Sequence, residues 1–523
     1  MLYESLLPEN VLDMNLLYMS LLCNELSLAL RQAFKYWRPH VQMLPNSPAE
    51  FVFIYVLRGL DINSLGMSSA SSHLIPQYFA GLSSATGSFI LGTVIGWTAQ
   101  TEHGIMDGEL GYKVSEREIA WLATLFTLGA ASVCIPTGFI IDVIGRKFTM
   151  LLCVPFLLLG WLLIAFSVNT IMLYIARFIL GMSGGAFCII APVYTTEIAQ
   201  TQIRGILGCF FQLLITMGIL YSYVIGAVCT VLVMTLTCIV LPIISGILFL
   251  ILPESPFFYV MKDKPEKAKS ALQRLRGKDY DITEDYEEIK TNVAEVKENP
   301  VALWKGMKRT ASLRAFALSI LLMMFQQFSG INVMMFYATD VFLLAKTGLE
   351  PKISTIVVGL VQVIATFVAL FLIDRSGRRT LLMISSFVMS LSTMGLGVYF
   401  FIMDRDSETA LSICWFPVLC CCLFIMMYSL GMGAIPWLIM AETFAEDIKG
   451  PATAISATTN WLFAFVITNA YGPLKNVIGT GQTFWIFSGF TLTCTIFVFF
   501  FLPETRHKTF AEVQAALEGK QNE

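Results

Sequence analysis

A short stretch in the second half of the chain concentrates amide side chains within an otherwise apolar segment. Gln326, Gln327 and Asn332 lie there, in Gln-Gln-Phe-Ser-Gly-Ile-Asn. An amide both donates and accepts hydrogen bonds, which suits the hydroxyl groups of a ring-shaped ligand. Polar side chains in such a segment are costly, so they are candidates for function. Gln326 and Tyr337 are eleven residues apart and would share a face of a straight helix, whereas Asn332 would need a break at Gly330 to turn inward.

Further amides and aromatic rings occur in other apolar segments. Trp437 follows Gly433-Ala-Ile-Pro436, where glycine and proline can break a helix and present an aromatic face. Aromatic faces with amides and no deep carboxylate predict a site for a neutral polyhydroxyl ligand; the alternative is that the amides only hold helices together. Gln362 is a further amide of this kind. The candidate binding residues are Gln212, Gln326, Gln327, Asn332, Trp437 and Asn460, the last beside Trp461.

Two charged cassettes interrupt the apolar chain and resemble each other. Gly138-Phe-Ile-Ile-Asp-Val-Ile-Gly-Arg-Lys147 is echoed by Asp374-Arg-Ser-Gly-Arg-Arg379. Glu197 to Arg204 is echoed by Glu442 to Lys449, and Pro253-Glu-Ser255 by Pro503-Glu-Thr505. Each echo comes roughly 230–250 residues later, which is typical of a two-bundle transporter with parallel repeats.

The charges of these cassettes have two interpretations. They can anchor helix ends and set membrane topology, or they can form an inner gate that locks the two bundles together and separates when the site faces inward. Because they recur in both halves, we favour the gate. Its candidate residues are Asp142, Arg146, Glu197, Arg204, Asp374, Arg378, Glu442 and Lys449.

The composition indicates a membrane protein. The chain is 56% hydrophobic and 14% charged, against about 25% charged for soluble domains. The net charge of -3 and the lack of a basic stripe argue against a nucleic-acid partner. Most of the cysteines lie in apolar spans and are interpreted as buried hydrophobes, so neither a disulfide framework nor a metal site is expected.

Apolar runs of about 20 residues, the length that crosses a bilayer, recur about twelve times. They lie at 74–100, 119–141, 148–168, 170–192, 206–228, 230–252, 315–339, 353–373, 380–403, 411–440, 450–473 and 480–502. The fifth and sixth spans should meet in a tight hairpin near Gly226. The sequence therefore predicts an all-α membrane protein of two six-helix bundles.

Five segments follow from this pattern. They are an N-terminal extension of unclear structure (1–72), a first bundle (73–253), a linker (254–312), a second bundle (313–503) and a tail (504–523). Lys and Arg gather on one side of the spans, which predicts that this side and both termini are cytoplasmic. The linker is expected to form short amphipathic helices, with a solvated linker as the alternative.

At these residues the chain resembles the sugar porter family of the major facilitator superfamily, over about residues 75–515. The resemblance rests on the cassettes above and on Arg177-Phe-Ile-Leu-Gly181, Pro192-Val-Tyr194, Gln326 to Asn332, Pro436-Trp437 and Asn460-Trp461. The branch it resembles is that of insect facilitated trehalose transporters. The resemblance implies that the six binding candidates contact sugar and that the eight gate candidates form the inner gate. Gln200 departs from the pattern, since the family usually has proline there.

The resulting expectation is a facilitative carrier for a neutral sugar such as trehalose or glucose, in the plasma membrane, working by alternating access. The alternatives are a proton/sugar symporter and a transport-dead sugar sensor. No residue between Leu74 and Gln100 is acidic, where symporters of this family carry an aspartate, so we expect no proton coupling. No enzymatic activity, cofactor, metal or obligate protein partner is expected; the partners are the sugar and the bilayer. The short tail after Pro503 argues against a sensor.

Overall fold

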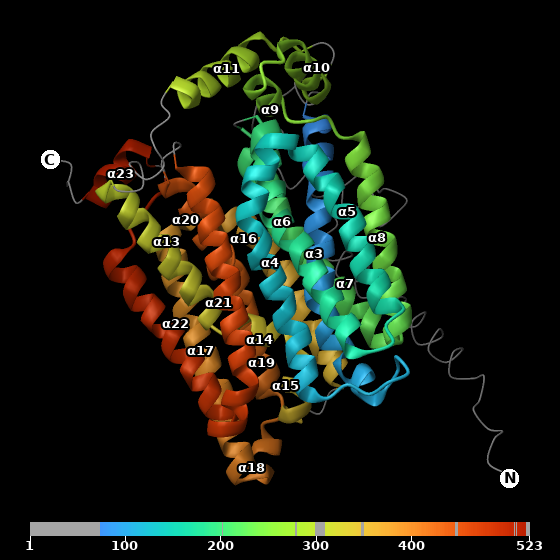
Figure 1. The fold of residues 1–523 in the computed structure, drawn as a ribbon. Helices are drawn as coiled ribbons and strands as arrows, with labels where there is room; N and C mark the ends of the chain where they lie inside the picture. Colours follow the sequence, from blue (N-terminus) through green and yellow to red (C-terminus); the bar gives the residue numbers. More distant parts are fainter. Residues whose placement is uncertain are drawn as a thin grey trace, which may run out of the picture. The chain divides into compact units, whose positions relative to one another are not determined.

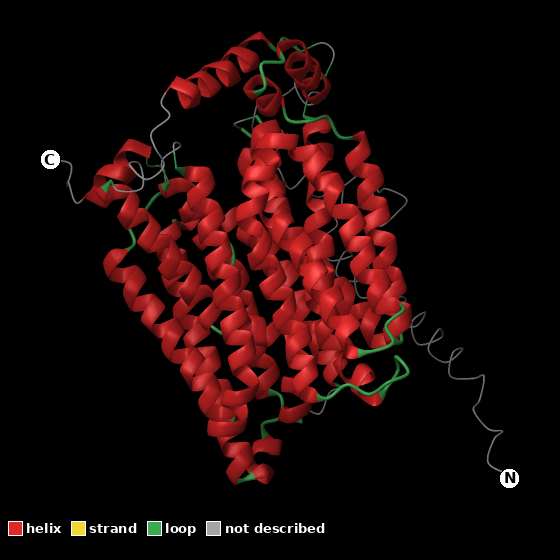
Figure 2. Ribbon diagram, in the orientation of Figure 1, coloured by secondary structure: helices red, strands yellow, loops and turns green. Residues whose placement is uncertain are grey.

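We describe residues 74–200, 202–277, 280–298, 309–346, 350–444, 448–506, 508 and 510–518 of a computed structural model. The expected extension 1–72 and His73 lie outside this part. The described elements are all helical (Figure 2), which confirms the expected fold class. Among them, eleven helices are long and apolar enough to cross a membrane.

The first bundle has six long helices. They are α3 (Ile75–Asp107), α4 (Glu116–Ile144), α5 (Arg146–Ala165), α6 (Thr170–Ile198), α7 (Arg204–Val228) and α8 (Val231–Ile251). Local signals set several of their starts. Ser115 and Glu118 form a capping box at α4, and Asn169 caps α6 through the N–H of Met172. The turn between α7 and α8 lies close to Gly226, as expected.

The second bundle repeats this order with broken helices. Its seventh span is split into α13 (Thr310–Phe328), α14 (Ile331–Phe336) and α15 (Ala338–Ala345), and its tenth into α19 (Phe416–Met427), a π-helix (Tyr428–Met432) and α20 (Ile435–Thr443). The remaining helices are α16 (Pro351–Ser376), α17 (Arg378–Arg405), α18 (Ser407–Ser412), α21 (Lys449–Ile478) and α22 (Thr480–Phe501). α21 coincides with the span expected at 450–473, although it is not one of the eleven strongly apolar helices.

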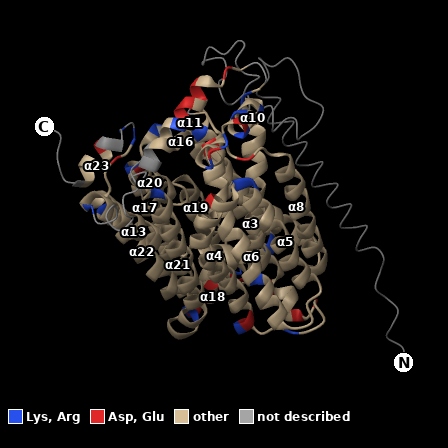
Figure 3. Cartoon of the chain, turned by 45° about the horizontal axis from the view of Figure 1, so that its top comes forward, with Lys and Arg blue, Asp and Glu red and all other residues tan. Residues whose placement is uncertain are grey.

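Short helices lie at one end of the bundles (Figure 1). They are α9 (Pro256–Met261), α10 (Pro265–Arg276) and α11 (Thr283–Glu298) from the linker, and α23 (Phe510–Glu518) from the tail. We call this end the insert end, and the end that carries α18 the opposite end. Lys, Arg, Asp and Glu gather mostly at the insert end, and the helix bodies are largely free of them (Figure 3). The described part of the linker forms short helices, as expected.

Glycines allow helices of the first bundle to touch backbone to backbone. A Cβ on Gly92 would lie 2.0 Å from the carbonyl oxygen of Ile215, and one on Gly218 would lie 2.0 Å from that of Phe89. Both clashes occur between α3 and α7. Since lipid supplies no hydrophobic force between helices, such close packing is a main source of their association.

Candidate functional site

Four of the six predicted binding residues form one hydrogen-bonded network inside the second bundle. Gln327 Nε2 donates to Asn460 Oδ1 (2.9 Å), Asn460 Nδ2 donates to Gln326 Oε1 (2.8 Å), and Asn332 Nδ2 donates to Gln327 Oε1 (2.6 Å). We call these four residues the amide network. Gln326 is 1% exposed and Asn460 is 2% exposed. An amide network of this kind presents donors and acceptors in a dry setting, where each counts more than in water.

The break in the seventh span positions this network. α13 ends at Phe328, and Gly330 takes a left-handed conformation with φ 86°, which favours glycine. The expected break is therefore present, and it places Asn332 within reach of Gln327. The expectation for Tyr337 is wrong: the break at Gly330 separates it from Gln326, and Tyr337 itself lies at the junction of α14 and α15, so the straight-helix spacing does not apply. Its ring packs instead on Tyr471, with 5.2 Å between centroids.

The break in the tenth span is tied to the same network. Gln326 Nε2 donates to the carbonyl oxygens of Met432 (2.8 Å) and Gly433 (3.1 Å). These carbonyls lie where the π-helix gives way to α20, so Gln326 compensates backbone groups that the break would leave unpaired. Trp437 lies half-buried on the first turn of α20, as Gly433 and Pro436 predicted.

An aromatic ring of the first bundle packs against rings of the second bundle. Phe126 of α4 meets Trp461 edge-to-face at 5.7 Å and Phe336 at 6.0 Å. Arg177 lies over the Phe126 ring at 5.2 Å and donates to the carbonyl oxygens of Leu122 (3.0 Å) and Val94 (2.9 Å). Its guanidinium is thus held by carbonyls and rings.

Two predicted amides stay apart from the network. Gln212 lies half-buried on α7 of the first bundle, and the bonds described for the amide network do not include it. Gln362 lies on α16, is 2% exposed, and its Oε1 has no hydrogen-bond partner among the described residues.

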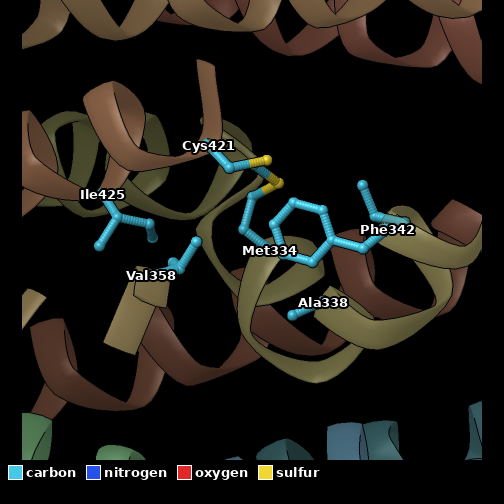
Figure 4. A pocket seen from close by; sticks show the side chains of 7 residues that line it. Met334, Ala338, Phe342, Val358, Cys421 and Ile425 are labelled. Atoms are coloured by element: carbon cyan, nitrogen blue, oxygen red, sulfur yellow. The ribbon is translucent and has the colours of Figure 1, made fainter. Parts of the chain in front are cut away.

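A small apolar cavity lies among α14, α15, α16 and α19 of the second bundle (Figure 4). Its volume of about 10 Å³ leaves room for no more than about one water. It therefore offers no site for a sugar. It is lined by Met334, Ala338, Val341, Phe342, Val358, Cys421 and Ile425.

At the insert end, the charged cassettes form two similar clusters. In the first bundle Arg146, 3% exposed, pairs with Glu197 (2.7 Å) and with Asp142 (3.1 Å). Ser255 donates a short hydrogen bond to Glu197, and Glu254 Oε1 accepts from the backbone N–H groups of Arg146 (2.9 Å) and Lys147 (3.1 Å).

The second bundle repeats this arrangement with Arg378 and Glu442 (3.2 Å). Thr505 donates to Glu442 (2.5 Å), and the two oxygens of Glu504 accept from the backbone N–H groups of Arg378 (2.9 Å) and Arg379 (3.1 Å). Both arginine–glutamate pairs join helices of the same bundle, whereas the gate hypothesis placed such pairs between bundles. The reason is geometric: each arginine starts a helix whose neighbour in its own bundle carries the glutamate.

The other gate candidates have different settings. Arg204 is exposed at the start of α7, and Lys449 is half-buried at the start of α21. The Asp374 side chain lies outside the described part.

The contacts that join the bundles at the opposite end were not predicted. Gln100 Nε2 donates to Thr355 Oγ1 (2.5 Å), Tyr223 Oη donates to the carbonyl oxygen of Met335 (3.1 Å), and Lys352 Nζ donates to that of Gly226 (3.2 Å). In each pair one residue belongs to the first bundle and the other to the second. A polar Gln100 at the end of an apolar span was the one signal in the sequence.

A buried carboxylate lies next to these contacts. α3 continues to Asp107, beyond the limit of 100 expected for the first span, so Glu102 lies within the helix. Its side chain is buried, with the residue 7% exposed. The expectation of uncoupled transport covered the first span only as far as Gln100, so it did not include this residue.

Comparison with known proteins gives a consistent result. Residues 67–517 match the family model described as "Sugar (and other) transporter". The chain is 32% identical over 447 residues to the facilitated trehalose transporter Tret1 of Aedes aegypti, and this match covers 85% of this chain and 55% of that protein. The chain thus spans about half the length of several curated relatives. It is 33% identical to the Tret1-2 homolog of Drosophila sechellia, where 85% of this chain and 91% of the relative are covered.

Solved structures share the fold. A proton:xylose symporter of the major facilitator superfamily, XylE bound to 6-bromo-6-deoxy-D-glucose, superposes with a TM-score of 0.70 at 21% identity, covering 86% of this chain and 100% of that chain. The inward-open form of XylE from E. coli gives a TM-score of 0.67 at 21% identity, covering 83% and 98%.

Proposed function

Since this chain belongs to the Sugar (and other) transporter family, and is therefore a multi-pass membrane transporter and not an enzyme, we propose that it carries a neutral sugar such as trehalose or glucose by facilitated diffusion. The observation that carries this proposal is the amide network at the breaks of two helices. Amides can exchange their bonds to each other for bonds to sugar hydroxyls, so the polar groups stay satisfied with and without ligand. The names of the trehalose-transporting relatives support the choice of substrate.

The roles we propose follow from position. Gln326, Gln327, Asn332 and Asn460 would bind hydroxyls, and Trp437 would stack on the apolar face of the sugar ring. Gln212 would contribute from the first bundle once the sugar draws the bundles together. Broken helices are suited to this task because one half can move while the other stays packed.

Alternating access would use the two ends of the bundles in turn. The contacts at the opposite end, such as Gln100 with Thr355, would open to admit sugar there, and the charged clusters at the insert end would hold each bundle in shape during the movement. The excess of basic residues supports an insert end that faces the cytoplasm, with the plasma membrane as the location.

Uptake of radiolabelled sugars by a cell without its own sugar transporters tests the function. We expect saturable uptake of trehalose or glucose, competition by the unlabelled sugar, and no uptake of a charged sugar acid. A sensor would bind the sugar in detergent but give no uptake in sealed vesicles, and this outcome would overturn the proposal.

A second measurement distinguishes facilitated diffusion from symport. In sealed vesicles the sugar should equilibrate and not accumulate, since coupling needs a titratable group that reaches both solvent faces along the path. Accumulation driven by an inward proton gradient, and abolished by a protonophore, would establish the symporter instead.

A further inference from the structure

Glu102 is a buried carboxylate that the transport path described above does not use. It lies on α3, 7% exposed, and no described residue donates a hydrogen bond to its Oε2. Taking an ionised carboxylate out of water without partners is costly, and such a group tends to take up a proton instead.

The groups that face Glu102 belong mainly to the second bundle. Among charged groups, Asp340 of α15 has the strongest electrostatic influence on Glu102, followed by Lys475 of α21 and then by Glu116 at the start of α4 in the first bundle. Asp340 and Lys475 are paired at 3.2 Å, so the single lysine is already shared. The acidic groups outnumber it, and the environment of Glu102 is unfavourable for a further negative charge.

Two tyrosines complete the surroundings of Glu102. Tyr337 and Tyr471 both lie within the electrostatic reach of Glu102 and Asp340, and their hydroxyl groups have no hydrogen-bond partner among the described residues. On α3 itself, His103 follows directly and Asp107 lies exposed at the helix end.

This cluster lies where the two bundles meet at the opposite end. Gln100, two residues before Glu102, bonds Thr355 across the bundles. Separation of the bundles there would take Glu102 away from Asp340 and Lys475 and expose it to water. Closure would return it to a dry setting beside those charges.

We propose that Glu102 is a proton-binding site that controls closure of the opposite end. When that end is open, Glu102 is ionised in water. When it closes, the carboxylate takes a proton from the solution on that side and forms a neutral carboxyl group beside the Asp340–Lys475 pair. Acid on that side therefore favours the closed state. If closure binds one proton, the ratio of open to closed protein falls about tenfold for each unit by which the pH is lowered.

The test measures access to the opposite end without any sugar, so it does not depend on the proposed substrate. Thr339→Cys provides a buried reporter next to Asp340, since Thr339 is 2% exposed. A membrane-impermeant thiol reagent is applied from that side at a series of pH values. Labelling of the native cysteines is measured in the unsubstituted protein and subtracted. The effect of pH on the reactivity of the thiol itself is measured with Ser407→Cys, an exposed position on α18.

We expect the corrected labelling rate to fall by up to about tenfold per pH unit as the solution is acidified. Glu102→Gln, which mimics the protonated group, should label slowly at every pH. Glu102→Asp should keep the pH dependence, and Lys475→Met should move it to higher pH by about one unit, because an opposite charge is lost.

Asp107→Asn is the matched control, because it changes an exposed acid to an amide on the same helix and should behave as wild type. A labelling rate that does not change with pH in the Thr339→Cys protein, with no further substitution, would overturn the proposal. So would a slope that survives in Glu102→Gln or disappears in Asp107→Asn.

Discussion

Replacing Gln326 by alanine removes three hydrogen bonds at once. The side chain donates to the carbonyls of Met432 and Gly433 and accepts from Asn460. Its loss frees the carbonyls of Met432 and Gly433 at the break before Trp437 and removes one of the bonds that orient Asn460, which keeps the bond from Gln327.

The magnitude follows from the bonds that matter for the ligand. One bond from Gln326 to a sugar hydroxyl is lost, and Asn460, which loses its bond to Gln326 and keeps only that from Gln327 within the network, binds a second hydroxyl less well. At about 1 kcal/mol for each net hydrogen bond, sugar binding should weaken by about 2 kcal/mol, or roughly thirtyfold in affinity. Membrane proteins give values at the lower end for such bonds, so tenfold is the smallest effect we expect.

The assay compares half-saturation in sugar uptake with the amount of protein at the cell surface. Gln482→Ala is the matched control, because it removes the same amide from α22, outside the amide network. Gln326→Ala should raise the half-saturation concentration at a normal surface level, and Gln482→Ala should not. Unchanged half-saturation for every transported sugar in Gln326→Ala would refute the assignment of the amide network as the binding site.

Three further predictions concern folding, the insert end and pH. Gly218→Ala should strongly reduce the amount of protein at the cell surface, because its Cβ would lie 2.0 Å from a carbonyl oxygen of α3. Gly208→Ala is the control and should have no effect, because nothing lies within 4 Å of its Cβ. Equal amounts of the two variants at the surface would contradict this prediction. Glu197→Gln should loosen the contact between α5 and α6 at the insert end, because it weakens the charged pair with Arg146. Cysteine labelling from each side would reveal the change, and unchanged labelling would leave the cluster an anchor only. Partial burial acts to raise the pKa of Glu504, but hydrogen bonds from backbone N–H groups hold this pKa below its usual value. The ionised Glu504 therefore contributes its full stabilisation above its pKa in the unfolded chain, and this stabilisation is lost as the pH falls through its lower pKa in the folded protein. Glu504→Gln should flatten the acid side of a plot of melting temperature against pH. An unchanged plot would contradict this prediction.

Much of the fold could be predicted because the apolar spans and the charged cassettes are local signals. The break at Gly330 also came from local chemistry, since glycine next to serine is a common cause of a kink in an apolar helix. The spacing argument for Tyr337 failed because it assumed a straight helix across the break at Gly330. Spacing arguments hold only along an unbroken helix.

The contacts between bundles were beyond prediction for a different reason. Gln100 and Thr355 are 255 residues apart in the sequence, and no pattern in one sequence couples such positions. The end of α3 was missed for another reason: the helix continues past the apolar run to Asp107, where Gly108 caps it in a left-handed conformation with φ 93°. The charged pairs were found by type, but their partners depend on which helices are neighbours.

The way Glu254 and Glu504 are bound has a consequence for how this chain can diverge. Both accept hydrogen bonds from backbone N–H groups at the start of a helix, after Gly145 and Gly377, whose positive φ values are 100° and 85°. A Cβ on either glycine would lie within 2.7 Å of the carboxylate. The interaction therefore requires a glycine and an acid, and it accepts either basic side chain two residues after the glycine, as Lys147 in one copy and Arg379 in the other illustrate. Exchange of lysine and arginine at that position should therefore be tolerated, whereas a change at the glycine or the glutamate should be viable only together with a compensating change.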